Sequence, residues 1–351
     1  MADGTGRGRG GAPGRRASSY DVAALAGVSQ SAVSRAFRPG APVSEAVRRR
    51  VLAAAAELGF RPNAMARGLA TSRSGIVAVA IGTIGNPIYP AVLDAFSREV
   101  SARGRQLLLL TDLDDAEAVM GRVVQYGVDA VIVTASARLE PSRAVARACA
   151  KAGIPAVLYN RVLPDLRAPA VVCANRAGGR LVADLLLRAG HRRFAFIGGP
   201  EETSTNTDRR DGFAARLAEA GLPPPALATG RYAYEAGQAA MLDLAARGVP
   251  PDALFCTNDL LAIGAMDAAR RDLGLRVPED LSVVGFDDVP MAAWESYALT
   301  TVAQRIGVMA ARAMDLAEAA MDGDAGATVI EVPGDLVARR SARLPPDISA
   351  S

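Results

Sequence analysis

The sequence SSYDVAALAGVSQSAVSRAF, residues 18–37, determines the fold of the N-terminal part of the chain. It predicts a short helix over residues 20–26 that ends at Gly27, because glycine readily adopts the left-handed conformation that closes a helix. Ser29 is placed to cap a second short helix over residues 30–37. Two short helices joined by a glycine turn are typical of a helix-turn-helix unit.

The residues around this stretch complete a small basic unit. Ser44 is placed to cap a third helix that ends at Gly59. A small core is expected from the apolar side chains of the first two helices, namely Val22, Leu25, Ala26, Val28, Val33 and Phe37. Residues 18–73 contain eight arginines and three acidic residues, whereas the whole chain has a net charge of only +3. A basic unit on a more acidic remainder favours binding to a polyanion such as DNA.

After Arg73 the pattern changes to alternating strands and helices. Short apolar runs predict strands at residues 76–81, 106–111, 130–134, 156–159, 170–173, 193–197, 253–256 and 282–286. Amphipathic stretches between most of them predict helices, among them residues 89–102, 175–189, 209–220, 233–247 and 259–273. This alternation is typical of an α/β fold with parallel sheets.

Composition excludes several classes of protein. A chain of 351 residues, half of them apolar, is long enough for two or three domains. Its three cysteines form no CxxC pair and it has one histidine, so we expect neither a disulfide framework nor a metal centre. No phosphate-binding glycine motif opens a predicted helix, and we expect no cofactor. Residues 1–17 form a basic tail without an apolar signal region, and no apolar run could span a membrane, which favours the cytoplasm.

Residues 20–29 and Ala32-Val33-Ser34-Arg35 closely resemble the DNA-binding headpiece of the LacI/GalR family of bacterial repressors. The resemblance continues through the core in a series of short motifs: Asn86-Pro87, Gly190-His191-Arg192-Arg193, Gly212-Phe213, Asn258-Asp259, Val284-Gly285-Phe286-Asp287-Asp288 and Leu299-Thr300-Thr301-Val302. It covers residues 18–343, which is nearly everything except the two ends.

The family fold implied is an all-α helix-turn-helix headpiece followed by an α/β core of two periplasmic-binding-protein-like subdomains with parallel sheets. The headpiece would cover residues 18–62, a hinge helix and linker 63–73, and the core 74–343, with a tail at 344–351. The first subdomain would combine residues 74–174 and 302–333, and the second residues 175–301 and 334–343. The chain would cross between them near Ala174, Thr301 and Pro333.

The resemblance implies a surface that reads DNA. A recognition helix meets base edges with its N-terminal residues, which points to Gln30 and Ser31, and Arg35 lies one turn further on. In the hinge helix, Leu69 would insert into the minor groove. The expected DNA-binding residues are Ser18, Tyr20, Ser29, Gln30, Ser31, Ser34, Arg35, Asn63, Ala66 and Leu69.

The resemblance also implies an effector site between the subdomains. Its expected residues follow predicted strand ends or match family positions: Asn86, Tyr89, Asp112, Asn160, Arg161, Arg209, Asn258, Asp287 and Gln304. Amides, a carboxylate and arginines suit a small polar effector such as a sugar or sugar derivative. Asn160-Arg161 replaces the Asp-Arg pair common in the family, so the resemblance does not identify the effector. His191 and Asp288 are expected to be structural.

We therefore expect a homodimeric repressor that binds a pseudo-palindromic double-stranded DNA operator and has no tetramerising C-terminal helix. An enzyme would need a nucleophile–base pair, a metal cluster or a cofactor loop, and none is evident in the sequence. A periplasmic solute-binding protein would share the core fold, but the DNA-binding headpiece and the missing signal segment argue against it. The sequence leaves open the operator and whether the effector acts as inducer or corepressor.

Overall fold

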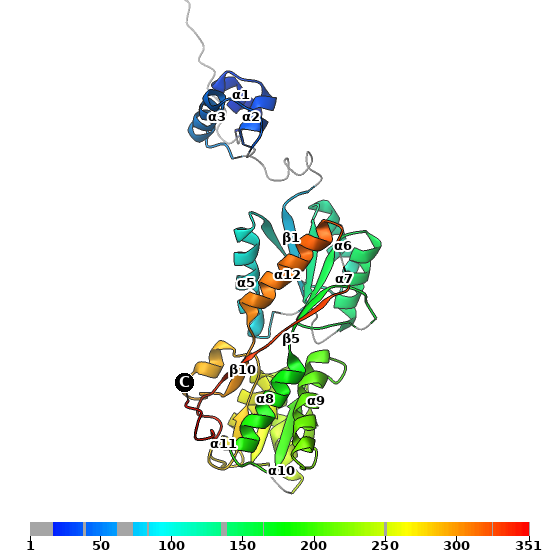
Figure 1. Cartoon of the computed structure of the whole chain (residues 1–351), viewed down its shortest axis with the longest axis vertical. Coiled ribbons are helices and arrows are strands. Elements are labelled where there is room, and N and C mark those ends of the chain that lie inside the picture. Colours follow the sequence, from blue (N-terminus) through cyan, green and yellow to red (C-terminus); the bar gives the residue numbers. More distant parts are fainter. Residues whose placement is uncertain are drawn as a thin grey trace, which may run out of the picture. The chain divides into compact units, whose positions relative to one another are not determined.

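The structure, a computed structural model, describes residues 17–37, 40–61, 73–82, 84–134, 139–163, 165–248, 251–324 and 326–350. The chain divides into two compact units, Met1–Ser74 and Gly75–Ser351. The first is the helical headpiece, and the second is the α/β core (Figure 1). Among the described residues, no helix is both long and apolar enough to cross a membrane.

The headpiece contains three short helices whose ends follow from local sequence: α1 (Ser19–Ala26), α2 (Gln30–Ala36) and α3 (Glu45–Glu57). Ser18 and Asp21 form a reciprocal capping box at the start of α1, where each side chain bonds to the backbone N–H of the other. Gly27 ends α1 in the left-handed conformation at φ 63°. The Ser29 side chain accepts a hydrogen bond from Ala32 N and so caps α2.

The headpiece core is built from small and branched side chains. Val22, Val33 and Val51 are fully buried at the junction of the three helices. The prediction that Leu25 belongs to this core is wrong, because 47% of its surface is exposed. The buried face of α1 is centred on Val22 and Ala26, and at about 100° per residue the Leu25 side chain points well away from it.

The core contains two parallel sheets. The larger has strand order β11-β5-β4-β3-β1-β2, and the smaller has β7-β6-β8-β9. The strands of the larger sheet are β1 (Ile76–Ile81), β2 (Gln106–Leu110), β3 (Ala130–Thr134), β4 (Ala156–Tyr159), β5 (Ala170–Cys173) and β11 (Val329–Val332). Those of the smaller are β6 (Phe194–Gly198), β7 (Ala226–Thr229), β8 (Ala253–Cys256) and β9 (Ser282–Val284). The predicted fold class is confirmed.

Helices cover both faces of each sheet. Along β1, Val77 and Val79 face the cluster that contains α5 and α12, whereas Ala78 and Ala80 face α6 and α7. On the smaller sheet, α8 and α9 cover one face and α10 and α11 the other. The helices are α5 (Ile88–Ala102), α6 (Ala116–Gln125), α7 (Leu139–Lys151), α8 (Asn175–Arg188), α9 (Ser204–Glu219), α10 (Tyr234–Ala246), α11 (Asp259–Arg271) and α12 (Ile306–Met321), with a 3-10 turn η1 (Pro290–Ala293).

The chain passes three times between the two sheets. It leaves β5 and enters α8 on the smaller sheet, then returns through β10 (Thr301–Ala303) to α12 on the larger sheet. After β11 it crosses again through β12 (Asp335–Val337), which pairs antiparallel with β10. We refer to the larger and smaller sheets, each with its helices, as the first and second subdomains.

Close contact between α8 and α9 depends on glycine. A Cβ atom added at Gly179 would lie 2.1 Å from the carbonyl oxygen of Arg209, and one at Gly212 would lie 2.0 Å from that of Arg176. Backbone cannot yield to such a contact without moving a whole helix. The two glycines therefore set the distance between α8 and α9.

We predict that Gly212→Ala lowers the free energy of unfolding by roughly 1–3 kcal/mol, because the added methyl group pushes α8 and α9 apart. Gly121→Ala in the exposed face of α6 is the matched control, since a Cβ there meets nothing within 4 Å. Alanine should stabilise α6 by about 0.5–1 kcal/mol. Urea unfolding of both variants checks this, and equal stabilities would contradict the packing argument.

Candidate functional site

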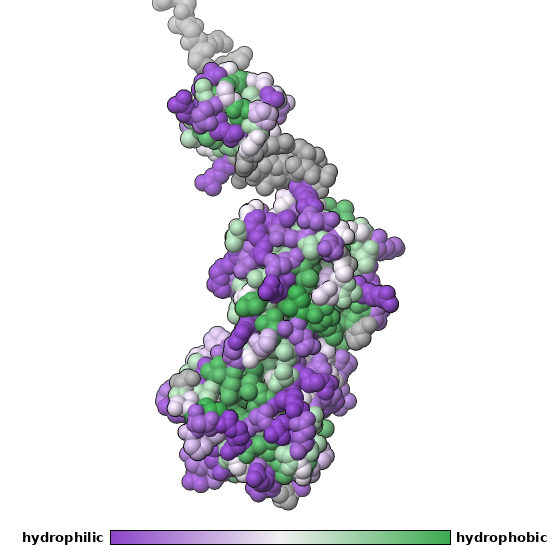
Figure 2. All heavy atoms as spheres, in the orientation of Figure 1, coloured by the Kyte–Doolittle hydropathy of each residue, from purple (hydrophilic) through white to green (hydrophobic). Residues whose placement is uncertain are grey.

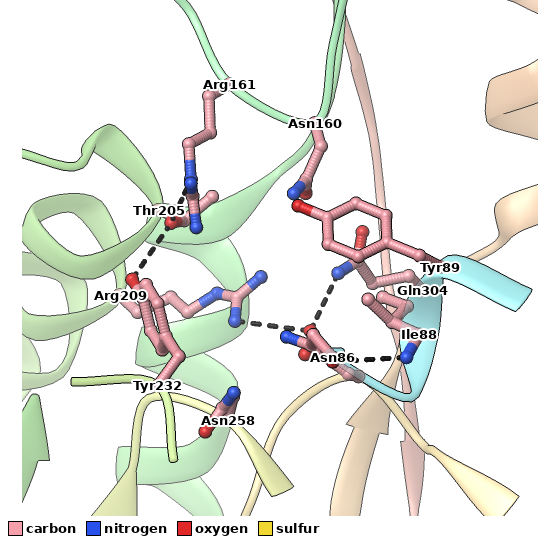
Figure 3. A pocket seen from close by; sticks show the side chains of 11 residues that line it. Asn86, Ile88, Tyr89, Asn160, Arg161, Thr205, Arg209, Tyr232, Asn258 and Gln304 are labelled. Atoms are coloured by element: carbon pink, nitrogen blue, oxygen red, sulfur yellow. Dashed lines mark hydrogen bonds and ion pairs between the residues drawn. The ribbon is translucent and has the colours of Figure 1, made fainter. Parts of the chain in front are cut away.

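The core encloses a polar pocket of about 280 Å³, part of which is open to solvent. Both subdomains contribute to its wall, at the carboxyl ends of their strands or the first turns of the helices that follow. The lining residues are Asn86, Ile88, Tyr89, Asn160, Arg161, Thr205, Arg209, Tyr232, Asn258, Asp287 and Gln304 (Figure 3). Eight of the nine residues that the sequence predicted for the effector site are among them.

A buried ion pair lies on the side of the second subdomain. Nη1 of Arg209 is 3.3 Å from Oδ1 of Asp287, and Nε2 of Gln304 donates to the same oxygen at 2.7 Å. Burial raises the pKa of the Asp287 carboxyl, and the positive charge of Arg209 opposes that rise. Oδ1 therefore has two donors, and Asp287 itself has an unusual backbone φ of 115°.

Arg209 is fixed by further contacts. Its Nε donates to Oδ1 of Asn175 at 2.8 Å, and its Nη1 donates to the carbonyl oxygen of Thr257 at 2.6 Å. The guanidinium also stacks over the Phe286 ring, with Cζ 3.6 Å from the ring centroid. This network holds the guanidinium in one orientation at the wall of the pocket.

Arg161 links the two subdomains. It follows β4 in the first subdomain, and its Nε donates to Oγ1 of Thr205 at 3.0 Å, in the first turn of α9 of the second. Its guanidinium lies 5.3 Å from the centroid of the Tyr232 ring. The Tyr232 hydroxyl is in turn 2.9 Å from Oγ1 of Thr203. Figure 3 shows Arg161, Thr205 and Tyr232 together on one side of the pocket.

Tyr89 and Asn160 form the opposite part of the wall. Both are buried, and burial raises the pKa of the Tyr89 hydroxyl. Asn160 has a left-handed backbone at φ 72°. Its Oδ1 is buried without a hydrogen-bond partner among the described residues. Such an orphan acceptor is costly unless a ligand or an ordered water donates to it.

Asn258 has a double role. Its Oδ1 accepts from Leu261 N at 3.0 Å and caps α11, so its amide N–H groups are the part that a ligand could use. Asp112 stands apart from the other predicted residues, since it is exposed after β2 and does not line the pocket.

The sequence prediction missed Thr205 and Tyr232. The predicted helix began at residue 209, whereas the observed helix α9 begins at Ser204. The additional first turn brings Thr205 to the pocket. Tyr232 follows β7, a strand that the sequence pattern did not indicate because both of its ends are exposed.

Three other polar residues have structural roles. Asp259 is fully buried and accepts hydrogen bonds from the Thr301 hydroxyl at 2.6 Å and from Val289 N at 2.8 Å. Asp288 forms a 2.8 Å ion pair with Arg339.

His191 is also buried, which lowers the pKa of its imidazole. Its Nδ1 lies 2.9 Å from an Arg343 nitrogen and 3.2 Å from Asp252 Oδ1, at a distance from the residues that line the pocket. These contacts agree with the structural role that we expected for His191.

The headpiece presents a polar surface on α2. Gln30, Ser31, Ser34 and Arg35 are exposed, as a base-reading helix requires. The hydroxyls of Ser29 and Ser18, in contrast, are engaged in capping α2 and α1.

Tyr20 leaves 70% of its surface exposed and is open to contact with DNA. Three predicted DNA contacts, Asn63, Ala66 and Leu69, lie outside the described residues.

Comparison with known families matches both units. Residues 20–63 match the family model of bacterial regulatory proteins of the lacI family, and residues 183–342 match that of a periplasmic binding protein-like domain. The fold and these two surfaces define a DNA-binding transcription regulator with an effector-binding core.

Relatives identify the family. The chain is 33% identical over 306 residues to the regulator CelR of Thermobifida fusca, covering 84% of this chain and 89% of CelR. It is 32% identical over 295 residues to the repressor CytR of Escherichia coli, covering 81% and 84%. The chain therefore belongs to the LacI family of bacterial regulatory proteins, as its sequence motifs predicted. Because its relatives are transcription regulators, it is a regulator and not an enzyme.

Solved structures agree with this assignment. A Lac repressor dimer bound to operator and an anti-inducer has a TM-score of 0.81 at 26% identity, covering 93% of this chain and 99% of that one. A complex of CelR with cellobiose has a TM-score of 0.70 at 30% identity, covering 93% and 100%.

We predict that Arg35→Ala weakens binding to the specific operator by about 1–3 kcal/mol, because a base-reading arginine loses its hydrogen bonds. Arg50→Ala, which removes an exposed arginine of α3, measures the effect of charge alone. Fluorescence anisotropy with operator and random DNA distinguishes the two effects. An equal loss on both DNAs for Arg35→Ala would show a phosphate contact and refute base reading.

Proposed function

We propose that this regulator is a cytoplasmic repressor whose operator affinity is controlled by a small polar effector of the sugar class. The observation that carries the proposal is the pocket itself, where both subdomains place buried polar side chains around one space. The family supports it, because CelR has been solved with cellobiose and Lac repressor with an anti-inducer.

The contacts across the pocket suggest how an effector acts. Arg161 and Thr205 come from different subdomains and are joined by one hydrogen bond. An effector that bonds to Arg161 on one side and Arg209 on the other would stabilise one relative placement of the subdomains. A ligand shifts such an equilibrium only by its difference in affinity for the two placements. We infer that the ligand's bond to Arg161, which spans the two subdomains, supplies that difference.

A homodimer on a pseudo-palindromic operator completes the proposal. One small headpiece offers too little contact area for regulatory affinity, and two-fold symmetry pairs two headpieces on two half-sites. The core surface in Figure 2 includes hydrophobic patches among hydrophilic side chains. Exposed apolar residues also lie on an outer strand of each sheet, with Leu109 on β2 and Leu227 on β7.

We predict that Arg209→Ala weakens binding of the compound found in a thermal-shift screen of sugars, sugar alcohols, nucleosides and sugar phosphates by about 2 kcal/mol or more. Alanine removes the buried guanidinium and leaves Asp287 without its ionic partner. The compound should then no longer change the operator affinity. Arg216→Ala on the same helix as Arg209, in a half-exposed ion pair with Asp184, is the control. Unchanged compound affinity in folded Arg209→Ala would remove Arg209 from the site.

We predict a dimer both free and on DNA, because each operator half-site needs its own headpiece. Sedimentation velocity of the full chain, alone and with an operator fragment, measures its mass. A monomer in both conditions would contradict the paired-headpiece proposal.

A further inference from the structure

The wall of the pocket has more positive than negative groups. Among the lining side chains that the structure describes, Arg161 and Arg209 are guanidinium groups and Asp287 is the single carboxylate. All three are at least nine-tenths buried, so solvent screens their charges weakly. The charged side chains of the wall therefore sum to one positive charge.

No second carboxylate among the described residues lines the pocket to neutralise this positive charge. Asp259, which directly follows Asn258 in the sequence, is buried but does not line the pocket. Its two oxygens already accept from the Thr301 hydroxyl and Val289 N. Asp259 thus serves the packing behind the pocket, where burial and the nearby charge of Asp287 raise the pKa of its carboxyl and favour its neutral form.

Helix geometry adds to the positive potential. Tyr89 lies in the first turn of α5, Thr205 in the first turn of α9, and Asn258 is the N-cap of α11. Three helix N-termini thus contribute residues to the lining of the same pocket. They meet there because helices follow the carboxyl ends of parallel strands in both sheets. The N-terminus of a helix carries a partial positive charge that favours an anion.

One acceptor in the pocket requires a hydrogen donor. Oδ1 of Asn160, which follows β4 in the first subdomain, is buried without a partner among the described residues. A hydroxyl group of a ligand can supply that donor.

Resting on the proposed function, we propose that the effector is a hydroxylated anion, a sugar acid or a sugar phosphate, and not a neutral sugar. Its anionic group binds near Arg161 and Arg209, and a hydroxyl donates to Asn160. Carboxylate and phosphate share the chemistry that the arginines recognise.

The test compares matched neutral and anionic ligands on the full-length protein by calorimetry at low salt. The probes are D-glucose, D-gluconate and D-glucose 6-phosphate, the corresponding galactose series, and inorganic phosphate. In at least one series we expect an anion to bind about 10-fold or more tightly than its neutral parent and than inorganic phosphate. The acid and phosphate arms identify which anionic group is used.

Variants assign the preference to the pocket. Arg161→Gln should reduce the preference for the anion to about 3-fold or less, whereas Arg161→Lys should retain most of it. Arg167→Gln, on the same connecting segment but exposed and outside this pocket, makes the same charge change and should leave the preference intact.

Two outcomes would overturn the inference. One is a neutral sugar that binds as tightly as both of its anions, and the other is no binding by any organic anion. The proposed function fails separately, if no probe of either kind and no compound from the wider screen changes operator affinity.

Discussion

The buried guanidinium of Arg209 is the interaction on which the second subdomain and its pocket depend. It contacts Asn175 at the start of α8, the carbonyl oxygen of Thr257 after β8, and Asp287 after β9. One side chain therefore joins the first crossing between subdomains to two strand ends of the smaller sheet. Burying such a charge is costly, and breaking the pair from one side costs roughly 3–5 kcal/mol. Asn175, the Thr257 carbonyl and Asp287 are therefore all needed to compensate the buried charge of Arg209.

The position of Arg209 is itself set by helix packing. Gly179 leaves space for the carbonyl oxygen of Arg209, and Gly212 lies one turn further along the same helix against Arg176. Any larger residue at these points would move α9 away from α8 and with it the guanidinium. Gly179 and Gly212 do not line the pocket, yet the requirement for glycine at these positions fixes the geometry of the site. Phe286, which stacks on the guanidinium, completes this fixation from the other side.

Much of this could be predicted from sequence, for physical reasons that differ between elements. The strands at 76–81 and 130–134 were predicted with the bounds of β1 and β3, because they are buried on both faces and read as continuous apolar runs. β7, β11 and β12 were missed because their exposed positions interrupt that pattern, and β10 was missed because it is only three residues long.

The candidate site shows the same division. Residues carried by motifs, such as Asn258 and Asp287, reach the pocket, whereas Thr205 could not be found without the true start of α9. Asp112 illustrates the opposite error, since a position after a strand end does not ensure that a side chain faces the ligand. Leu25 shows that an apolar type does not ensure burial on a short helix that has alanines on its inner face.

The charge of the pocket also bears on how strongly an effector could couple to DNA binding. Arg209 is held by its own subdomain whether or not a ligand is present, so it contributes affinity in either arrangement of the subdomains. Arg161 differs, because its Thr205 contact exists only while the two subdomains stand as they do here. A ligand bond to Arg161 is thus the one sensitive to their placement. Coupling energies of about 1–3 kcal/mol correspond to roughly 5–150-fold changes in affinity, which one charged hydrogen bond gained or lost can supply.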